Sequence, residues 1–399
     1  MKLSSRSKSY MIPEYNLTGD LLSFLTCGLQ YRYQNKGTLP PSMPIQLWFG
    51  EFIHGVMEEA YLQWELTQKE FPWDWKEDIR PLEDIIDMRL QVRGLYPPAN
   101  HFFTTNHPDI ELEISDLNEH DHKKLASARA EKAINIWGCD LFPLMESAEV
   151  LIKGLREMPY TQADKRSNYY GINGVIDVLS LININDDSNK IVKYIKNNEE
   201  MQKILKNLDK DEYEVIIDYK GMKRPPCDVV KSGNETWDYH EHQILTYSWL
   251  REKQEGHKPI AGIIFYLNEL VPSKEDLIII KEDINNNLTD IPTGLDGYEK
   301  DIELIEKWNE DEKMPELSEN FKIDRSIRII PIDDDKINES LTKFDNVVNE
   351  IETCIIKETK GCKIQDAWKA NAEKRTCEAC DFKTFCKNAK NKTKEFKIP

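Results

Sequence analysis

The stretch VIIDYKG, residues 215–221, holds a carboxylate and an amine side by side. Because side chains alternate along a β-strand, Asp218 and Lys220 would point to one face of the sheet and Tyr219 to the other. An ion pair is costly in a dry core, so this pair favours a hydrated edge of the sheet or a functional site. Taken alone, a D-x-K pattern is more often a structural ion pair.

A second carboxylate follows another apolar stretch. In GINGVIDVL, residues 171–179, Asp177 comes after residues typical of a buried strand. Gly171 and Gly174 precede it, and glycine permits the close approach of another backbone or side chain. Asp177 is therefore a candidate partner for the Asp218 and Lys220 pair.

Two predicted helices carry further polar residues. In GEFIHGVMEE, residues 50–59, Glu58 follows His54 by one turn on the same face. In HQILTY, residues 242–247, Gln243 and Tyr247 are four residues apart and reach in one direction. Each of these pairs, taken separately, is more often part of ordinary packing.

The elements that must position these residues can be read from the apolar spacing. Helical spacing covers 42–64, and residues 16–34, 121–138 and about 235–255 also read as helices. The stretches 149–155, 172–182, 212–221 and 259–267 are dense in β-branched and aliphatic residues and read as strands. LIII at 277–280 also has the length of a buried strand. Residues 65–120 show no clear period, and 183–210 form a polar excursion with one helix.

In this order the set resembles the RecB-like branch of the PD-(D/E)XK nuclease superfamily. The matching pieces are GEFIHGVMEE, GVIDVL, IIDYKG and QILTY, and they leave 65–145, 183–210 and 270–360 uncovered. The resemblance implies an α/β, restriction-endonuclease-like fold, in which a central mixed sheet is flanked by helices. It also implies metal-dependent hydrolysis of phosphodiester bonds.

The resemblance assigns roles to the residues of these motifs. Asp177 and Asp218 would be hard oxygen ligands for Mg²⁺ or Mn²⁺, joined by His54 and the backbone carbonyl of Tyr219. Lys220 would orient or deprotonate the attacking water and offset developing charge. The remaining assignments are Gln243 and Tyr247, which would position Lys220 or the scissile phosphate, and Glu149 and Glu58, which could order a metal-bound water.

Three cysteines near the end of the chain, Cys377, Cys380 and Cys386, fall within TCEACDFKTFC. A cysteine-held metal or cluster usually needs four ligands. RecB-like nucleases with iron–sulfur clusters, such as AddB-type subunits and the exonucleases of CRISPR spacer acquisition, place one cysteine before the histidine motif. The resemblance therefore implies Cys27 as the fourth ligand of a structural [4Fe-4S] cluster. Structural zinc is the alternative, and Cys354 or Cys362 could replace Cys27. Cys139 and Cys227 read as small buried residues.

Composition limits the classes of function. The net charge of −18 argues against general polyanion binding, because phosphate contacts need Lys and Arg. No apolar run approaches the roughly 18 residues of a membrane span, and MKLSSRSKSYMIPEYN lacks the apolar stretch of a signal peptide. We therefore expect a cytoplasmic protein without membrane association. Tyr31, Arg32, Lys223 and Arg224 are candidates for stacking on bases and contacting phosphates.

The expected organisation has five regions: 1–64 with the first cluster cysteine and the histidine motif, a partly helical insertion at 65–145, the nuclease core at 146–270 with its insertion 183–210, an acidic region at 271–360, and the cysteine cluster with a basic tail at 361–399. The leading hypothesis is a deoxyribonuclease, and exonuclease is the expected mode, on DNA ends or single strands. A helicase or another protein partner is expected from the acidic surface. The alternatives are a non-catalytic nuclease-like module that binds DNA or a helicase, and an RNase.

Overall fold

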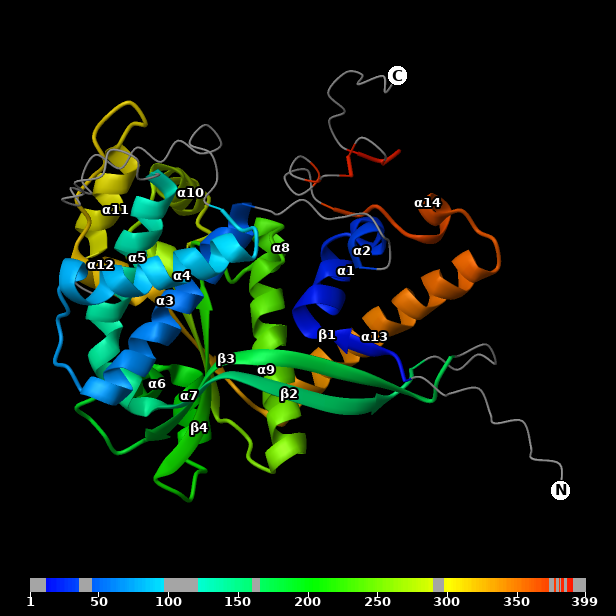
Figure 1. Ribbon diagram of the computed structural model, residues 1–399, viewed down its shortest axis with the longest axis horizontal. Helices are drawn as coiled ribbons and strands as arrows, with labels where there is room; N and C mark the ends of the chain where they lie inside the picture. Colours follow the sequence, from blue (N-terminus) through cyan, green and yellow to red (C-terminus); the bar gives the residue numbers. More distant parts are fainter. Residues whose placement is uncertain are drawn as a thin grey trace.

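The computed structural model describes residues 12–35, 45–96, 121–159, 166–289 and 298–372, together with 377, 380, 382, 383 and 386–389. These residues form an α/β fold whose mixed six-stranded sheet has helices on both faces (Figure 1). The general fold class predicted from the sequence is therefore confirmed.

The sheet contains parallel and antiparallel pairs. Its strands are β1 (Glu14–Asn16), β2 (Met145–Glu157), β3 (Tyr169–Asn183), β4 (Glu212–Lys220), β5 (Ala261–Tyr266) and β6 (Ile327–Pro331). The order is β1-β3-β4-β5-β6, and β2 also pairs with β3. β1 with β3 and β4 with β5 are parallel, whereas β2 with β3, β3 with β4 and β5 with β6 are antiparallel. Long β2 and β3 form the hairpin that extends from the body in Figure 1.

Each face of the sheet packs into its own hydrophobic core. Because side chains alternate, Ile217 and Ile263 enter one core, and Ile216 and Ile264 enter the other. The first core is completed by α3 (Ile45–Thr67), α4 (Arg80–Val92) and α5 (Asp121–Leu141). The second is completed by α9 (Thr236–Glu255) and α13 (Asp334–Thr359), together with the N-terminal helices. The two ends of the described chain thus share one core.

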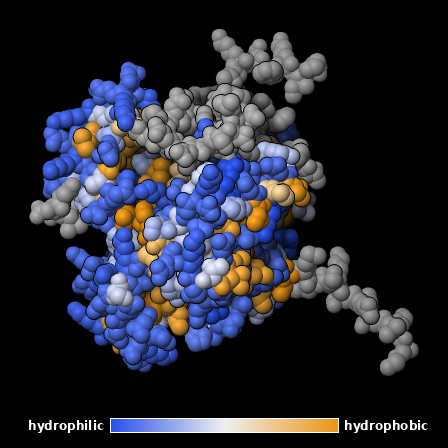
Figure 2. Space-filling view, turned by 60° about the vertical axis from the view of Figure 1, so that its left-hand side comes forward, coloured by the Kyte–Doolittle hydropathy of each residue, from blue (hydrophilic) through white to orange (hydrophobic). Residues whose placement is uncertain are grey.

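The remaining helices are shorter. They are η1 (Leu17–Leu22), α1 (Ser23–Thr26), α2 (Gly28–Asn35), η2 (Trp75–Ile79), η4 (Phe142–Leu144), α6 (Lys190–Asn197), α7 (Glu199–Leu205), α8 (Val229–Ser232), η5 (Leu267–Glu269), α10 (Lys274–Asn285), α11 (Tyr298–Lys307), α12 (Glu319–Ser326) and α14 (Ile364–Ala367). Helices α10, α11 and α12 enclose a separate small core that includes Leu277, Ile305 and Phe321. Hydrophilic side chains predominate on the face seen in Figure 2. Within the described ranges, no helix has the length and apolar character needed to cross a membrane.

Several sequence predictions need correction in detail. LIII at 277–280 is not a strand: it lies in α10, which begins with a capping box between Ser273 and Asp276. Residues 16–34 are not one helix, because η1, α1 and α2 follow β1. The aperiodic stretch after residue 65 contains η2 and α4, and Ile79 and Ile86 belong to the same core as α3. Strand β6, at 327–331 within the region 271–360, was not predicted.

Candidate functional site

The carboxylate and amine of VIIDYKG lie together at the end of β4, as the strand alternation predicts. Lys220 Nζ is 2.6 Å from Asp218 Oδ2, and the two side chains are 19% and 3% exposed. The Tyr219 ring points to the opposite face and stacks on Phe265. Burial raises the pKa of Asp218 to about 6, a shift that Asp177 increases and Lys220 opposes. The ion pair is therefore a nearly buried one, in which the carboxylate resists ionisation.

Helix α9 supplies the groups that hold this pair. Lys220 Nζ donates to Gln243 Oε1 over 2.9 Å. The amide nitrogen of Gln243 donates to Asp218 Oδ1 over 3.1 Å, and a longer contact of 3.4 Å reaches the Tyr247 hydroxyl. Gln243 thus donates to the acid and accepts from the base, and this fixes the orientation of its amide group. The prediction that Gln243 and Tyr247 reach in one direction is confirmed.

Glycines in the sheet allow α9 to come this close. A Cβ atom at Gly174 would lie 2.4 Å from Cε1 of Tyr247. A Cβ atom at Gly262 would lie 2.1 Å from Cγ2 of Ile244. Real Cβ atoms do not approach other atoms so closely, so both positions need glycine unless the helix shifts. Gly174 of GINGVIDVL therefore makes room for Tyr247 of HQILTY.

His54 of α3 and Asp177 of β3 meet the backbone of Tyr219. His54 Nε2 lies 2.8 Å from the Tyr219 carbonyl oxygen, and its Nδ1 lies 3.4 Å from Asp177 Oδ2. The Tyr219 amide donates to the same Asp177 oxygen over 3.0 Å. Three of the four ligands implied by the resemblance are therefore adjacent.

Glu149 completes a group of ligand atoms with His54 and Asp177. One ligand atom from each of the three residues lies within 4.8 Å of the other two. The register of β2 and β3 places Glu149 opposite Asp177, and Glu149 has a φ of 52°, which is uncommon for a residue other than glycine. Burial, followed by Asp177 and then Glu58, raises the pKa of Glu149. Like charges facing each other across a strand pair are unfavourable, so a cation would relieve this arrangement.

Asp218 is not a member of that trio in the described structure, since its carboxylate faces Lys220 and Gln243. Sequence reasoning gave Glu149 only a supporting role, because nothing in ESAEVLIKGL distinguishes it from an ordinary strand acid. The signal that identifies it is three-dimensional: it is the strand register opposite Asp177.

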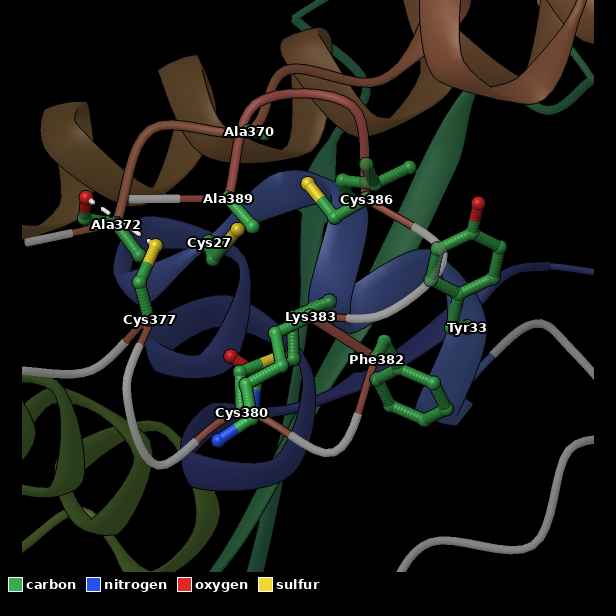
Figure 3. Close-up of a pocket in the computed structure, with 12 residues that line it drawn as sticks. Cys27, Tyr33, Ala370, Ala372, Cys377, Cys380, Phe382, Lys383, Cys386 and Ala389 are labelled. Atoms are coloured by element: carbon green, nitrogen blue, oxygen red, sulfur yellow. Dashed lines mark hydrogen bonds between the residues drawn. The ribbon is translucent and has the colours of Figure 1, made fainter. Parts of the chain in front are cut away.

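The four predicted cluster cysteines line one pocket. Cys27 comes from between α1 and α2, and Cys377, Cys380 and Cys386 come from the C-terminal segment; the other lining residues are Leu29, Gln30, Tyr33, Ala370, Ala372, Phe382, Lys383 and Ala389. Figure 3 shows the four cysteines around this one space. Cys354 and Cys362, the alternatives to Cys27, do not line it. Cys139 and Cys227 are exposed rather than buried, contrary to the prediction.

The pocket joins the two ends of the chain through contacts other than the cysteines. The Leu29 amide donates to the Lys369 carbonyl over 2.8 Å, and the Gly28 amide donates to the Asn371 side chain over 3.1 Å. The rings of Tyr33 and Phe382 lie 5.3 Å apart at the edge of the pocket. Cys27 is therefore held against the C-terminal segment by the hydrogen bonds of the two residues that follow it and by packing.

The four proposed nucleic-acid contacts have partners within the protein. Tyr31 is fully buried, and its hydroxyl donates to Asp20. Arg32 binds Glu358 through two nitrogens, and Lys223 pairs with Asp283 at 2.8 Å. The Arg224 guanidinium donates to the Ile327 carbonyl over 2.6 Å. In this arrangement the side chains tie parts of the protein together, so they lend no support to a path for nucleic acid.

No protein-family model matches the chain, and no curated protein matches it.

Proposed function

We propose that the protein is a divalent-metal-dependent nuclease of the PD-(D/E)XK type that hydrolyses DNA, with a RecB-like, restriction-endonuclease-like core. One observation carries the proposal. Two groups of side chains approach each other around the backbone of Tyr219. They are the array of Asp218, Lys220 and Gln243 and the group of His54, Glu149 and Asp177. Acid, amine and cation-ligand chemistry therefore meet at the end of one strand, and nuclease chemistry requires these groups together.

The residues present fit a hard divalent cation. His54, Glu149, Asp177 and the Tyr219 carbonyl would hold it, and Asp218 is the further carboxylate beside them. The presence of an imidazole suits Mn²⁺ as well as Mg²⁺. When bound, the cation would neutralise charge on phosphoryl oxygens and promote ionisation of water.

The side chains on the α9 face would serve the reacting groups. Lys220 has Asp218 and Gln243 as partners, which leaves one of the three ammonium donors for a water or a phosphate oxygen. Gln243 keeps the amine at this position, and Tyr247 supports the amide of Gln243. This preorganised arrangement suits stabilisation of the negative charge that develops on a phosphoryl group.

For the cysteine pocket we propose a structural [4Fe-4S] cluster. Tetrahedral zinc with bonds of about 2.3 Å would hold its sulfur atoms about 3.8 Å apart. Among the described residues, no three cysteine sulfurs lie within 4.8 Å of one another. The observation that supports the cluster is that four thiols from two distant parts of the chain line one pocket.

The proposed substrate is DNA at ends or in single strands, and a helicase or another protein partner would bring it to the site. The charge of −18 supports the partner, because a strongly acidic chain attracts DNA poorly by itself. A cytoplasmic location is part of the same proposal.

The test is cleavage of labelled single-stranded DNA, double-stranded DNA and RNA with Mn²⁺, Mg²⁺ or a chelator. Metal-dependent cleavage of DNA is expected. Cleavage of RNA alone would favour the RNase alternative. DNA binding without cleavage of any substrate would favour the non-catalytic module.

A further inference from the structure

A second set of buried polar side chains lies beside Lys220, outside the groups assigned above. His240 Nδ1 is 3.0 Å from the Tyr266 hydroxyl, and both residues are buried. Arg328, also buried, places its guanidinium carbon 4.2 Å from the centre of the Trp237 ring and 5.6 Å from that of Tyr266. Its Nη2 donates to the Pro225 carbonyl over 2.9 Å. The set therefore joins β5, β6, α9 and the loop that follows β4.

The strand register places this set next to the catalytic amine. Lys220 and Tyr266 are register partners on the parallel strands β4 and β5, so they emerge on the same face of the sheet. On α9, His240 comes one turn before Gln243, which accepts the hydrogen bond from Lys220. The Lys220 side chain thus has Asp218 and Gln243 as direct partners and the Tyr266–His240 pair as its neighbour along the strands and the helix.

The charge state of His240 agrees with this placement. Burial lowers its pKa well below the ordinary value, and the positive charges of Lys220 and then Arg328 lower it further. A neutral imidazole beside an ammonium avoids repulsion, and its hydrogen bond to Tyr266 fixes the orientation of the ring. Holding a long lysine side chain in one position costs rotamer freedom, so fixed neighbours are needed to favour that position.

We propose that His240, held by its hydrogen bond to Tyr266, is a positioning residue that keeps the Lys220 ammonium against Gln243 and Asp218, and that Arg328 anchors this pair to the loop after β4. The catalytic consequence rests on the nuclease function proposed above, whereas the positioning itself does not. Supporting groups of this kind determine whether a catalytic side chain stays in its productive geometry.

The first test reads the environment of Lys220 without substrate. Lysines of the full-length protein are labelled competitively with acetic anhydride and quantified by mass spectrometry, with Lys153 as the internal reference. Tyr266→Phe and His240→Leu are expected to increase the labelling rate of Lys220 several-fold. His240→Asn, whose amide can replace Nδ1 in the hydrogen bond, and Tyr213→Phe, which removes a hydroxyl near the start of β4, are expected to leave the rate unchanged.

The second test uses steady-state cleavage of DNA. Tyr266→Phe and His240→Leu should lower kcat by roughly 10- to 100-fold with little change in KM, because a displaced catalytic group affects the chemical step. His240→Asn should retain most of the kcat of the parent protein. Equal labelling of Lys220 in all variants, or equal behaviour of His240→Asn and His240→Leu, would overturn the proposal. If the parent protein cleaves no substrate, the nuclease function fails, while the labelling rates still decide the positioning.

Discussion

Tyr247 packs directly over Gly174, on the strand that carries Asp177. A methyl group at Gly174 would lie 2.4 Å from the tyrosine ring, which is buried and cannot move away freely. We expect Gly174→Ala to destabilise the protein by about 1–3 kcal/mol, since overpacking shifts neighbouring groups. Cleavage should also fall, because Tyr247 supports Gln243. Chemical denaturation and cleavage rates measure the two effects.

The matched control for this substitution is Gly50→Ala, in helix α3. A Cβ atom there meets nothing within 4 Å, and alanine is a better helix former than glycine. The free energy of unfolding of Gly50→Ala should be equal to that of the parent or slightly higher. A Gly174→Ala protein as stable and active as Gly50→Ala would show that Tyr247 can move without consequence.

The cysteine pocket predicts which thiols hold iron. The purified protein should be brown, and both Cys27→Ser and Cys377→Ser should lose colour and iron, because each removes one of the four proposed ligands that line the pocket. Cys139→Ser, which changes an exposed cysteine elsewhere, is the control and should keep both. Iron content and the visible spectrum are the readouts. Full iron in Cys27→Ser would contradict the shared pocket, and zinc without iron would favour the single-ion alternative.

Cation binding should weaken in acid because of Asp218. Its folded pKa is about 6, mainly through burial, so below that pH a proton must leave before the carboxylate can act as a ligand. The affinity for Mn²⁺ should fall by about tenfold for each pH unit below 6, as measured by calorimetry. Asp218→Asn should bind more weakly at neutral pH and should lack this part of the pH dependence. Identical pH profiles would show that Asp218 does not act on the bound cation.

His242 should make stability depend on pH. It is buried between α9 and α13, and neither ring nitrogen has a hydrogen-bond partner among the described residues. Burial lowers its pKa to about 4, and Lys343 adds to the effect. Below about 6.5, the ordinary histidine pKa, the unfolded chain takes up a proton that the folded protein refuses, so stability falls as pH decreases towards 4.

The loss attributable to His242 at pH 5 is about 2 kcal/mol relative to neutral pH. Replacing it in His242→Leu should reduce the stability difference between the two pH values by that amount, as measured by urea denaturation. An unchanged difference would show that the folded protein accommodates the protonated ring.

Local pattern was sufficient for much of the architecture. The strands at 149–155, 172–182, 212–221 and 259–267 appear as β2 to β5 with small changes in their bounds, because dense β-branched stretches are strong local signals. LIII was misread because its length suits both strand and helix, and the capping box of Ser273 and Asp276 decides in favour of a helix. The helix α4 was missed although its buried residues Leu82, Ile86 and Leu90 recur at helical spacing.

The candidate site was predictable where residues share a helix or strand. Asp218 with Lys220, and Gln243 with Tyr247, follow from spacing alone, and their contacts agree with it. Glu149 depends on the register of two strands, and Cys27 depends on the approach of two chain ends, which no local pattern encodes. Tyr31 was misjudged as a stacking residue because an aromatic, basic stretch does not reveal which of its side chains are buried.

The measurement that tests the central claim most directly is DNA cleavage by Lys220→Ala and Asp218→Ala beside the parent, with Mn²⁺ and with chelator. Both variants should lose cleavage by roughly 100-fold or more, while circular dichroism shows them folded and the chelator abolishes cleavage by the parent. Cleavage that persists in both folded variants would contradict the assignment of the site at the end of β4.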